Sequence, residues 1–385
     1  MDSPSYTATL LNRIADVSEA EWDRLVPDAH PFLSWRFFNA LEESGCTSVD
    51  TGWQPLHLWL KNEAGETIGA APLYAKSHSR GEYVFDHGWA EALQRAGAQY
   101  YPKLQCAVPF TPVTSPRLLA SSSEHKKTLA DALQYICLEQ GFSGIHATFL
   151  NDEDLPIFEN SRYLLRQDRQ FHFINRGYDS FDSFLDSLAS RKRKNIRKER
   201  KAAHEGLTIK RLTGDDIRPE HWDIFYQCYL DTSTRKWGRP YLNREFFARI
   251  HETMRDDILL VMAWEDDLPI ASALNFIGSN ALYGRNWGSL VHKPFLHFEL
   301  CYYQAIEAGI EMGLPKVEAG AQGEHKLARG YEPVITSSAH YLTQPNLHHA
   351  IEDYLKRERL AVNHEVKILE KHTPCLLYTS PSPRD

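Results

Sequence analysis

The chain has 385 residues, of which 42% are hydrophobic, 12% aromatic and 24% charged, and its formal net charge is −8. This length predicts two domains, the aromatic content argues against disorder, and the negative charge gives no support to a generic nucleic-acid coat protein. The six cysteines are irregularly spaced and form no CxxC pair, which predicts free thiols in a reducing compartment and no cysteine zinc site.

Targeting signals are not evident in the sequence. The first twenty residues lack a basic start followed by an apolar stretch, so they do not resemble a secretory signal. The longest strongly apolar run, Ile258 to Trp264, is far shorter than the ~18 residues of a membrane span. We therefore expect a cytoplasmic protein without an integral membrane segment. The segment from Cys375 to Asp385 reads like the translation of a sequencing-library adapter, and we treat it as an artefact that contributes nothing to the fold.

Two hairpins are predicted at similar places in the two halves of the chain. LHLWL (56–60) is followed by the turn-like KNEAGE and then by TIGAAPLYAK. ILLVMAW (258–264) is followed by EDDLP and then by IASALNFIG. An apolar run, a polar turn and a second apolar run are typical of a β-hairpin.

Each hairpin is expected to lead to a further strand, EYVFDHGWA at 82–90 in the first half and ALYGRNWGS at 281–289 in the second. Ile68 and Ile270 are 202 residues apart, and Trp89 and Trp287 are 198 apart. A nearly constant offset indicates a duplicated unit.

A helix and a strand then complete each unit. Apolar residues at 129, 132, 133 and 136 follow the helical spacing, Gly141 is a plausible stop, and IHATFL is the next strand. In the second half, HFELCYYQAIEAGIEMGL predicts a helix that ends near Gly313, and PKVEAG predicts a strand. Hairpin, helix and strand together form an α/β unit that occurs twice.

We predict an α/β protein (α+β mixed sheets) with domains at 1–170 and 171–345. Phe181, Phe184, Leu185 and Leu188 mark an apolar helical face, with Ser180 as its N-cap. A basic helix over 181–204 is therefore assigned to the second domain. Residues 346–374 are expected to form a polar C-terminal helix, followed by the artefact at 375–385.

The most unusual feature is RKRKNIRKERK, Arg191 to Lys201, in which eight of eleven residues are basic and one is acidic. Such a block repels itself, so an anionic partner is plausible: coenzyme A phosphates, transfer RNA, a lipid pyrophosphate or an anionic membrane face. The alternative is a solvated helix face. The candidate anion-binding residues are Arg191, Arg193, Lys194, Arg197 and Lys198.

A second candidate region is YYPKLQCAVPFTPVTSPRLL, Tyr100 to Leu119, which has four prolines and three aromatics in twenty residues. Proline fixes φ and removes a donor, so this composition predicts a shaped loop. The loop is either a wall of the binding site or a structural cover over the first sheet. Its Tyr101 and Lys103, with Asp86 and His87 nearby, are candidate substrate-binding residues.

Two loops follow strand candidates in the second half, GRNWGS (284–289) and EAGAQGEHKLARGYEP (318–333). Their glycines permit close backbone approach to a ligand, and the second loop brings acid, base and cation together. The alternative is that the glycines only form turns and that the charged side chains face solvent. The candidates are Glu318 as acceptor of an amine proton, and Arg285, Asn286, Trp287, Gln322 and His325 as binding residues.

Other site classes lack their motifs. His348 and His349 are merely adjacent, and no HExxH spacing occurs, so no metal site is expected. The sequence has no P-loop, no GxGxxG fingerprint and no GxSxG elbow, which argues against the corresponding nucleotide-binding and hydrolase classes.

The chain resembles the FemAB-like family of N-acyltransferases, which belongs to the GNAT superfamily. Proteins of this family are described as peptidoglycan biosynthesis or recognition proteins. The resemblance is carried by residues 30–46, 52–53, 100–114, 190–201, 282–289 and 318–333. It implies two tandem GNAT-like domains and transfer of an acyl or aminoacyl group to an amine acceptor, a small molecule or cell-wall precursor. The donor would be acyl-CoA or an aminoacyl-tRNA. The alternative is a non-catalytic protein that recognises a cell-wall fragment or an anionic ligand through the same cleft.

The resemblance also implies a functional lysine in the final glycine-rich loop, which is Lys326 here. We expect it to stabilise negative charge at the transfer centre, in the second domain. The Q/R-x-x-G-x-G/A loop of acetyl-CoA-dependent GNAT enzymes is not evident, which speaks against acetyl-CoA. Backbone donors that polarise the carbonyl leave no mark in a sequence.

Overall fold

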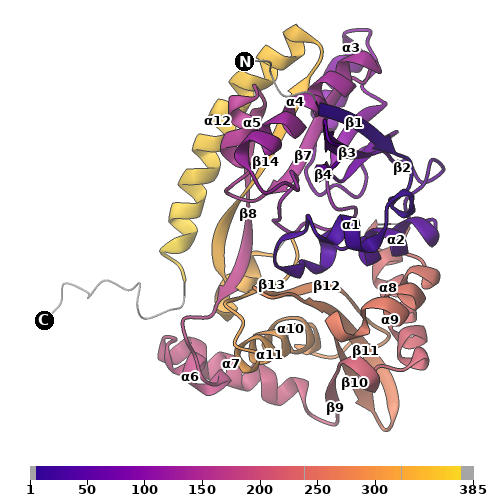
Figure 1. Cartoon of the computed structure of the whole chain (residues 1–385). Helices are drawn as coiled ribbons and strands as arrows, with labels where there is room; N and C mark the ends of the chain where they lie inside the picture. Colours follow the sequence, from indigo (N-terminus) through magenta and orange to yellow (C-terminus); the bar gives the residue numbers. More distant parts are fainter. Residues whose placement is uncertain (1–5, 238, 322, 374–385) are drawn as a thin grey trace, which may run out of the picture. The chain divides into compact units, whose positions relative to one another are not determined.

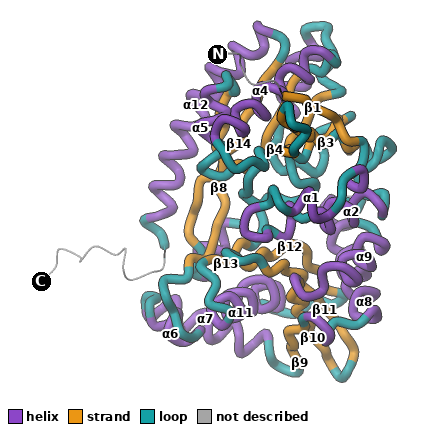
Figure 2. The backbone as a smooth tube through the Cα atoms, in the orientation of Figure 1, coloured by secondary structure: helices purple, strands orange, loops and turns teal. Residues whose placement is uncertain are grey.

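The computed structural model describes residues 6–237, 239–321 and 323–373 of the chain (Figure 1). Two compact units are present: the first contains residues up to Asp168 together with Ile335–Asn363, and the second contains Arg169–Val334 and the residues from His364 onward. Candidate residue Gln322 and the segment 375–385 lie outside the described residues. Figure 2 shows where the helices, strands and loops lie along the backbone.

The first unit is built on two sheets. A three-stranded sheet has the order β1-β3-β4, and the strands of a second, mixed sheet follow the order β2-β5-β6-β7-β14. Its elements are β1 (Tyr6–Leu11), α1 (Glu19–Asp23), α2 (Trp35–Glu43), β2 (Trp53–Pro55), β3 (His57–Asn62), β4 (Thr67–Ala71), β5 (Leu73–Lys76), α3 (His87–Arg95), β6 (Lys103–Cys106), α4 (Ser123–Glu139), β7 (Gly144–Leu150) and α5 (Leu155–Asn160). Three elements run on from one unit into the other: β8 (Leu164–Ile174), β14 (Glu332–Leu342) and α12 (Pro345–Glu370).

Helix α4 illustrates how the sequence forms the first core. The Ser122 hydroxyl caps it by accepting from the backbone N–H of His125, and Gly141 ends it with a φ of 71° that suits glycine. Leu129 and Leu133 of its apolar face are fully buried against the sheet. Each such side chain contributes about 1.5–3 kcal/mol of hydrophobic stabilisation.

The second unit has one mixed sheet, in which the strands follow the order β8-β13-β12-β11-β10-β9. Helix α8 packs on β11 and β12, while α11 contacts β12 and β13. The elements are α6 (Phe181–Asp186), α7 (Ser190–Ala203), β9 (Thr208–Leu212), α8 (Pro219–Trp237), α9 (Arg244–Met254), β10 (Ile258–Glu265), β11 (Leu268–Ile277), β12 (Leu282–Ser289), α10 (Leu296–Phe298), a π-helical turn (Glu299–Tyr303), α11 (Gln304–Glu311), β13 (Lys316–Glu318) and a 3₁₀ segment (Glu324–Arg329).

The predicted hairpins are present, but they are used differently. In the second unit, β10 and β11 pair directly through a turn at Asp266 and Asp267, both with positive φ. In the first, β3 pairs with β4 in the small sheet, whereas the rest of the predicted second strand forms β5 in the other sheet.

The strand predicted at 82–90 is wrong. This segment is a loop followed by helix α3, so Trp89 is helical whereas Trp287 lies in strand β12. The counterpart of β12 in the first unit is instead β6, because β6 pairs in parallel with β7 as β12 does with β13. Strand β6 lies inside the segment 100–119, for which the composition predicts a loop.

The basic helix predicted over 181–204 is two helices. Ser180 caps α6 as expected, with a reciprocal capping box to Ser183. The chain then leaves helical geometry, since Ala189 has φ −54° and ψ 137° before α7 begins. Leu188 is buried in this break, which separates the apolar helix α6 from the basic helix α7.

Candidate functional site

The second unit contains a wedge between two parallel strands. Strands β12 and β13 pair only at Leu282–Val317 and Tyr283–Glu318. Beyond this point β13 ends, while β12 continues to Ser289 alongside β11. A register shift between Leu274 and Asn275 of β11 bends the sheet at the same level. The separation of the strands leaves room for a ligand between them.

A pocket occupies this wedge and has about 70 Å³ of water-accessible space, in a hollow of about 350 Å³ that includes its open mouth. The lining, called the wedge pocket below, consists of Ala273, Leu274, Asn275, Gly284, Arg285, Asn286, Trp287, His297, Cys301, Tyr302 and Ala319.

The helical side of the wedge pocket is an irregular turn. Residues Glu299–Tyr303 form a π-helix between α10 and α11, and π-bulges are often found at functional sites. Cys301 and Tyr302 of this turn line the pocket, and His297 stacks on Trp287 with 4.4 Å between ring centroids. The Tyr302 hydroxyl lies 2.8 Å from Nε2 of His325.

Lys326 is 1% exposed and is not among the residues that line the wedge pocket, but its amine contacts the residue that follows lining residue Ala319. Its Nζ donates to the carbonyl of Gly320 at 2.9 Å, next to the lining residue Ala319. Burial lowers the pKa of Lys326 to about 8, because charge is disfavoured away from water. Lys326 is therefore a desolvated cation whose charge is bound by a backbone carbonyl.

Glu318 is buried but does not line the wedge pocket. Its Oε1 accepts from Lys316 Nζ at 2.6 Å, and its Oε2 lies 3.8 Å from His172 Nε2. Burial lowers the pKa of His172, so the imidazole beside Glu318 is neutral at pH 7. The other candidates of this region separate into two groups: Arg285, Asn286 and Trp287 line the pocket, and His325 reaches it through Tyr302.

One side of helix α7 is tied to the π-helical turn. Arg200 pairs with Glu299 at 3.0 Å and with Glu307 at 2.8 Å, and its guanidinium lies over the ring of Phe181. Glu199 binds Arg329 at 3.0 Å. These contacts fix α7 against the elements that carry the wedge pocket.

The opposite side of α7 carries a basic stripe, which we define as Arg191, Lys194, Lys198 and Lys201. Their spacing places them on one helical face, and all four are exposed. Within the described part of the chain none of the four has an ion-pair partner. Arg193 and Arg197 differ, because they pair with Asp186 at 2.7 Å and with Asp182 at 3.2 Å.

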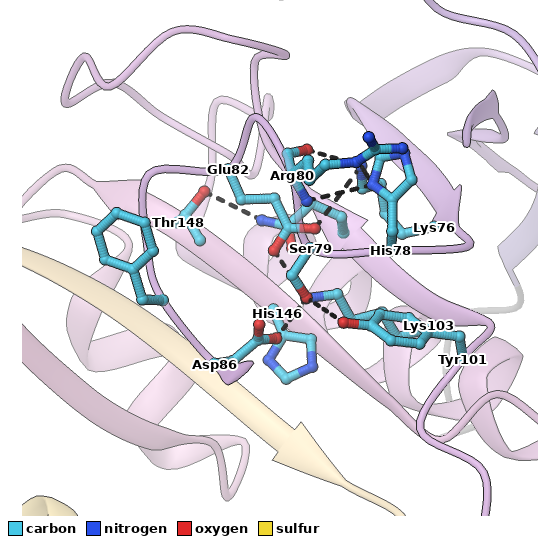
Figure 3. A network of polar contacts seen from close by, with 12 residues as sticks. Lys76, His78, Ser79, Arg80, Glu82, Asp86, Tyr101, Lys103, His146 and Thr148 are labelled. Atoms are coloured by element: carbon cyan, nitrogen blue, oxygen red, sulfur yellow. Dashed lines mark hydrogen bonds and ion pairs between the residues drawn. The ribbon is translucent and has the colours of Figure 1, made fainter. Parts of the chain in front are cut away.

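The first-unit candidates fall into a buried network (Figure 3). Lys103 Nζ donates to Glu82 at 2.7 Å and also to Asp86, and both carboxylates are buried. The Tyr101 hydroxyl bonds Ser79 Oγ at 2.8 Å at the edge of the network. His87 is exposed at the start of α3 and takes no part.

Burial and neighbouring charge set the protonation states of this network. Burial alone would raise the pKa of Asp86, but Lys103 holds it well below its usual range. Burial raises the pKa of Glu82 to about 7 and lowers that of Lys76 to about 6. The pKa of His146 falls to about 3, so this imidazole is neutral.

Comparison with known proteins places the chain in a family. The model of a family described as peptidoglycan biosynthesis/recognition, FemAB-like, matches residues 13–376. The chain belongs to the FemAB-like family. No protein of curated function matches it.

Solved structures show the fold of this FemAB-like chain. FemX is 13% identical with a TM-score of 0.54, and the match covers 87% of this chain and 98% of FemX. L-PGS from Bacillus licheniformis is 9% identical with a TM-score of 0.50, covering 83% of this chain and 96% of that one. A conserved protein of unknown function from Bacteroides thetaiotaomicron is 10% identical with a TM-score of 0.52, covering 88% and 100%. The predicted class, α/β with two tandem GNAT-like domains, is confirmed.

No helix among the described residues of this FemAB-like chain is both long and apolar enough to cross a membrane.

Among the wedge-pocket residues that sequence reasoning missed are three on its helical side, His297, Cys301 and Tyr302. They lie in a stretch whose apolar pattern predicts an ordinary core helix, and the π-helical turn that carries Cys301 and Tyr302 has no sequence signature. A cluster of His, Cys and Tyr at the start of that helix was the available signal.

Proposed function

We propose that this FemAB-like protein transfers an acyl or aminoacyl group to an amine in the wedge pocket of its second unit. The observation that carries the proposal is the separation of two parallel strands beside a desolvated lysine, Lys326. Membership of a peptidoglycan biosynthesis/recognition family supports a cell-wall precursor as the amine acceptor. A cytoplasmic location is part of the proposal, and the five described cysteines, all free thiols, support it.

The reaction needs three things from the pocket. The amine attacks the donor carbonyl, the tetrahedral intermediate carries an oxyanion, and its collapse releases the thiol of coenzyme A or the ribose hydroxyl of tRNA. Preorganised donors around the oxyanion are usually the largest catalytic contribution. Lys326 supplies a cation beside the pocket, and the strand edge left by the wedge supplies backbone N–H groups.

A group must also accept the proton of the attacking amine. Glu318 is the residue that the sequence favours, and His297 is the imidazole that lines the pocket. His297→Asn and Glu318→Gln distinguish them, because only the true acceptor should reduce kcat at unchanged protein stability.

Of the two donors, the basic stripe on α7 favours aminoacyl-tRNA. Four exposed cations along one helix face match a run of phosphates better than the few phosphates of coenzyme A. The absence of a recognisable acetyl-CoA loop in the sequence agrees with this choice.

The experiment is incubation of the protein with acyl-CoA and with charged tRNA donors against a panel of amines, including peptidoglycan precursors, with products detected by mass spectrometry. Transfer by the wild type that is lost in Lys326→Ala supports the proposal. Saturable binding without turnover of any donor would instead show a recognition protein. Full activity in the double variant Lys326→Ala, Glu318→Ala would place the reaction elsewhere.

A further inference from the structure

One sheet of the first unit has a buried face made of polar side chains. Strand pairing aligns Tyr74 with Gln105, Gln105 with His146, and His146 with His340 across β5, β6, β7 and β14. We define the polar face as Tyr74, Lys76, Lys103, Gln105, His146, Thr148, Ser338 and His340, all of which are buried.

The opposite face of the same strands is an ordinary apolar core. Leu104, Cys106, Ile145 and Ala147 pack there with helix α4. Polar residues at every second position normally indicate a strand face that meets water. Here the face is covered instead, and loop residues Glu82 and Asp86 reach down onto it from the segment after β5 (Figure 3).

A hydrogen-bonded chain crosses the polar face. Ser338 Oγ lies 2.8 Å from His340 Nε2, the two Nδ1 atoms of His340 and His146 are 2.7 Å apart, and His146 Nε2 lies 3.2 Å from the Tyr100 hydroxyl. Tyr100 donates to Asp86 at 2.7 Å. Because ionised Asp86 only accepts, the Tyr100 oxygen must accept from His146, and the ring protons of His146 and His340 are fixed in turn.

Among the described residues, the unpartnered atoms of this face are all oxygens. Glu82 Oε1, Asp86 Oδ1, Gln105 Oε1 and the Tyr74 hydroxyl are buried without a hydrogen bond, and Glu82 Oε1 has only a 3.7 Å ion-pair contact with Lys76. The ring nitrogens of His146 and His340 and the amines of Lys76 and Lys103 each have a partner. Gln105 Oε1 and the carboxylate oxygens of Glu82 and Asp86 can only accept, and buried polar groups are nearly always satisfied in proteins, so a hydrogen-bond donor would match these three atoms.

A cavity and strained backbone lie beside the same network. The cavity has about 30 Å³ of water-accessible space in a hollow of about 360 Å³ that includes its mouth, and Ser338 is the residue that it shares with the polar face. Its lining consists of Tyr83, Val84, Phe85, Phe149, Arg166, Gln167, Asp168, Thr336, Ser337 and Ser338. Tyr83 and Phe149 hold φ values of 59° and 56°, a left-handed conformation that non-glycine residues rarely adopt. Such strain gathers at ligand sites, where surrounding structure maintains it.

We propose that the polar face of the first unit is a binding site for a small primary amine. The ammonium group donates to Glu82, Asp86 and Gln105, the last of which lies two residues along β6 from Lys103, about 7 Å on the same face. Asp86, Lys103 and Tyr101, expected from the sequence to contact a substrate, belong to this site or its edge. The site is made by the first unit alone, so it stands whether or not the wedge pocket transfers an acyl group.

The test is calorimetric titration of the full chain with matched pairs that differ in one group: D-glucosamine against D-glucose, and ethanolamine against ethylene glycol. We expect the amine of at least one pair to bind at least tenfold more tightly than its hydroxyl counterpart. Equal binding of both members of each pair, or no binding of either, would overturn the proposal.

Variants locate the site. Glu82→Gln should weaken amine binding at least tenfold, whereas the control Glu42→Gln should leave it unchanged, because the Glu42 oxygens are already bonded by Ile14 and His57 in the same unit. Gln105→Leu removes an unpartnered oxygen without adding charge and serves where Glu82→Gln does not fold. Amine binding unaffected by Glu82→Gln or by Gln105→Leu would show that the polar face is only structural.

Discussion

Both units contain two parallel strands connected by helices, but they differ in the charged residues on these strands and beside them. In the first, α4 connects the parallel strands β6 and β7, and in the second, α10 to α11 connect the parallel strands β12 and β13. The first unit fills this frame with paired charges, in which Lys103 is shared between Glu82 and Asp86. The second leaves the strands apart and places beside them Lys326, whose amine meets a backbone carbonyl.

The difference is one of electrostatic compensation. Glu82 and Asp86 keep Lys103 charged despite complete burial, so its pKa is raised. Burial lowers the pKa of Lys326 to about 8, since none of the described carboxylates opposes the desolvation. The charge of Lys103 is already matched by two carboxylates, whereas that of Lys326 remains available to a ligand or an oxyanion. Each prediction below tests this contrast.

The largest effect is expected on stability. Lys103→Met leaves two buried carboxylates without their cation, and breaking a buried pair in this way costs about 3–5 kcal/mol. Lys326→Met removes a desolvated amine and should change the free energy of unfolding by less than about 1 kcal/mol, because burial of that charge was itself unfavourable. Urea unfolding followed by circular dichroism measures both. Similar destabilisation of the two variants would mean that the two lysines do not differ in compensation.

The second effect is expected on catalysis, and here we expect Lys326, not Lys103, to be the important lysine. Lys326→Ala should lower kcat of the proposed transfer by about 10²–10³, the typical effect of removing one oxyanion-stabilising group. Lys326→Arg keeps the charge and should recover part of the rate. The control is Lys293→Ala, which removes a cation of the same unit that is paired with Glu265. If Lys293→Ala and Lys326→Ala reduce kcat equally, general positive charge rather than Lys326 supports the reaction.

The contrast between the units was only partly predictable from sequence. The β10–β11 hairpin, helix α4 and helix α12 have clear periodicity and are found close to their predicted bounds. Strand β6 was missed because four prolines surround it and its K-L-Q-C alternation is too short to stand out. The burial of Lys103 and Gln105 depends on a covering loop, which is a tertiary property that no local pattern contains.

The pocket of the second unit shows the same limit. Arg285, Asn286 and Trp287 were found because glycines punctuate the strand that carries them. Strand separation at the wedge, however, depends on where β13 ends, and the three residues of KVE do not indicate this. Family resemblance supplied Lys326, and its desolvation came only from the packing.

A third, smaller effect tests the basic stripe against the paired arginines of the same helix. Replacing Arg191, Lys194, Lys198 and Lys201 by glutamine should weaken tRNA binding about 30–100-fold at low salt. It should also flatten the slope of log Kd against log salt by nearly one unit for each phosphate that the protein no longer neutralises. Arg193→Gln with Arg197→Gln is the control, because these side chains already pair with Asp186 and Asp182. An unchanged slope in the stripe variant would show that the basic stripe of α7 is only a solvated helix face.

The smallest effect is a pH dependence assigned to Lys326. Its pKa of about 8 means that the cation predominates at pH 7 and falls to about one tenth of the population at pH 9. If the cation stabilises the oxyanion, its contribution is present below the pKa and disappears as pH rises through 8. The attacking amine acts in the reverse direction, since deprotonation makes it a better nucleophile. The contribution of the attacking amine cancels in the ratio of wild-type to Lys326→Arg kcat, because both enzymes act on the same amine. The ratio then reports the charge of Lys326 alone, since arginine remains charged throughout. We expect this ratio to fall about tenfold between pH 7 and pH 9, as the lysine becomes neutral. A ratio that stays constant from pH 7 to 9 would show that the cation is not used, and a ratio that rises with pH would make Lys326 the proton acceptor instead.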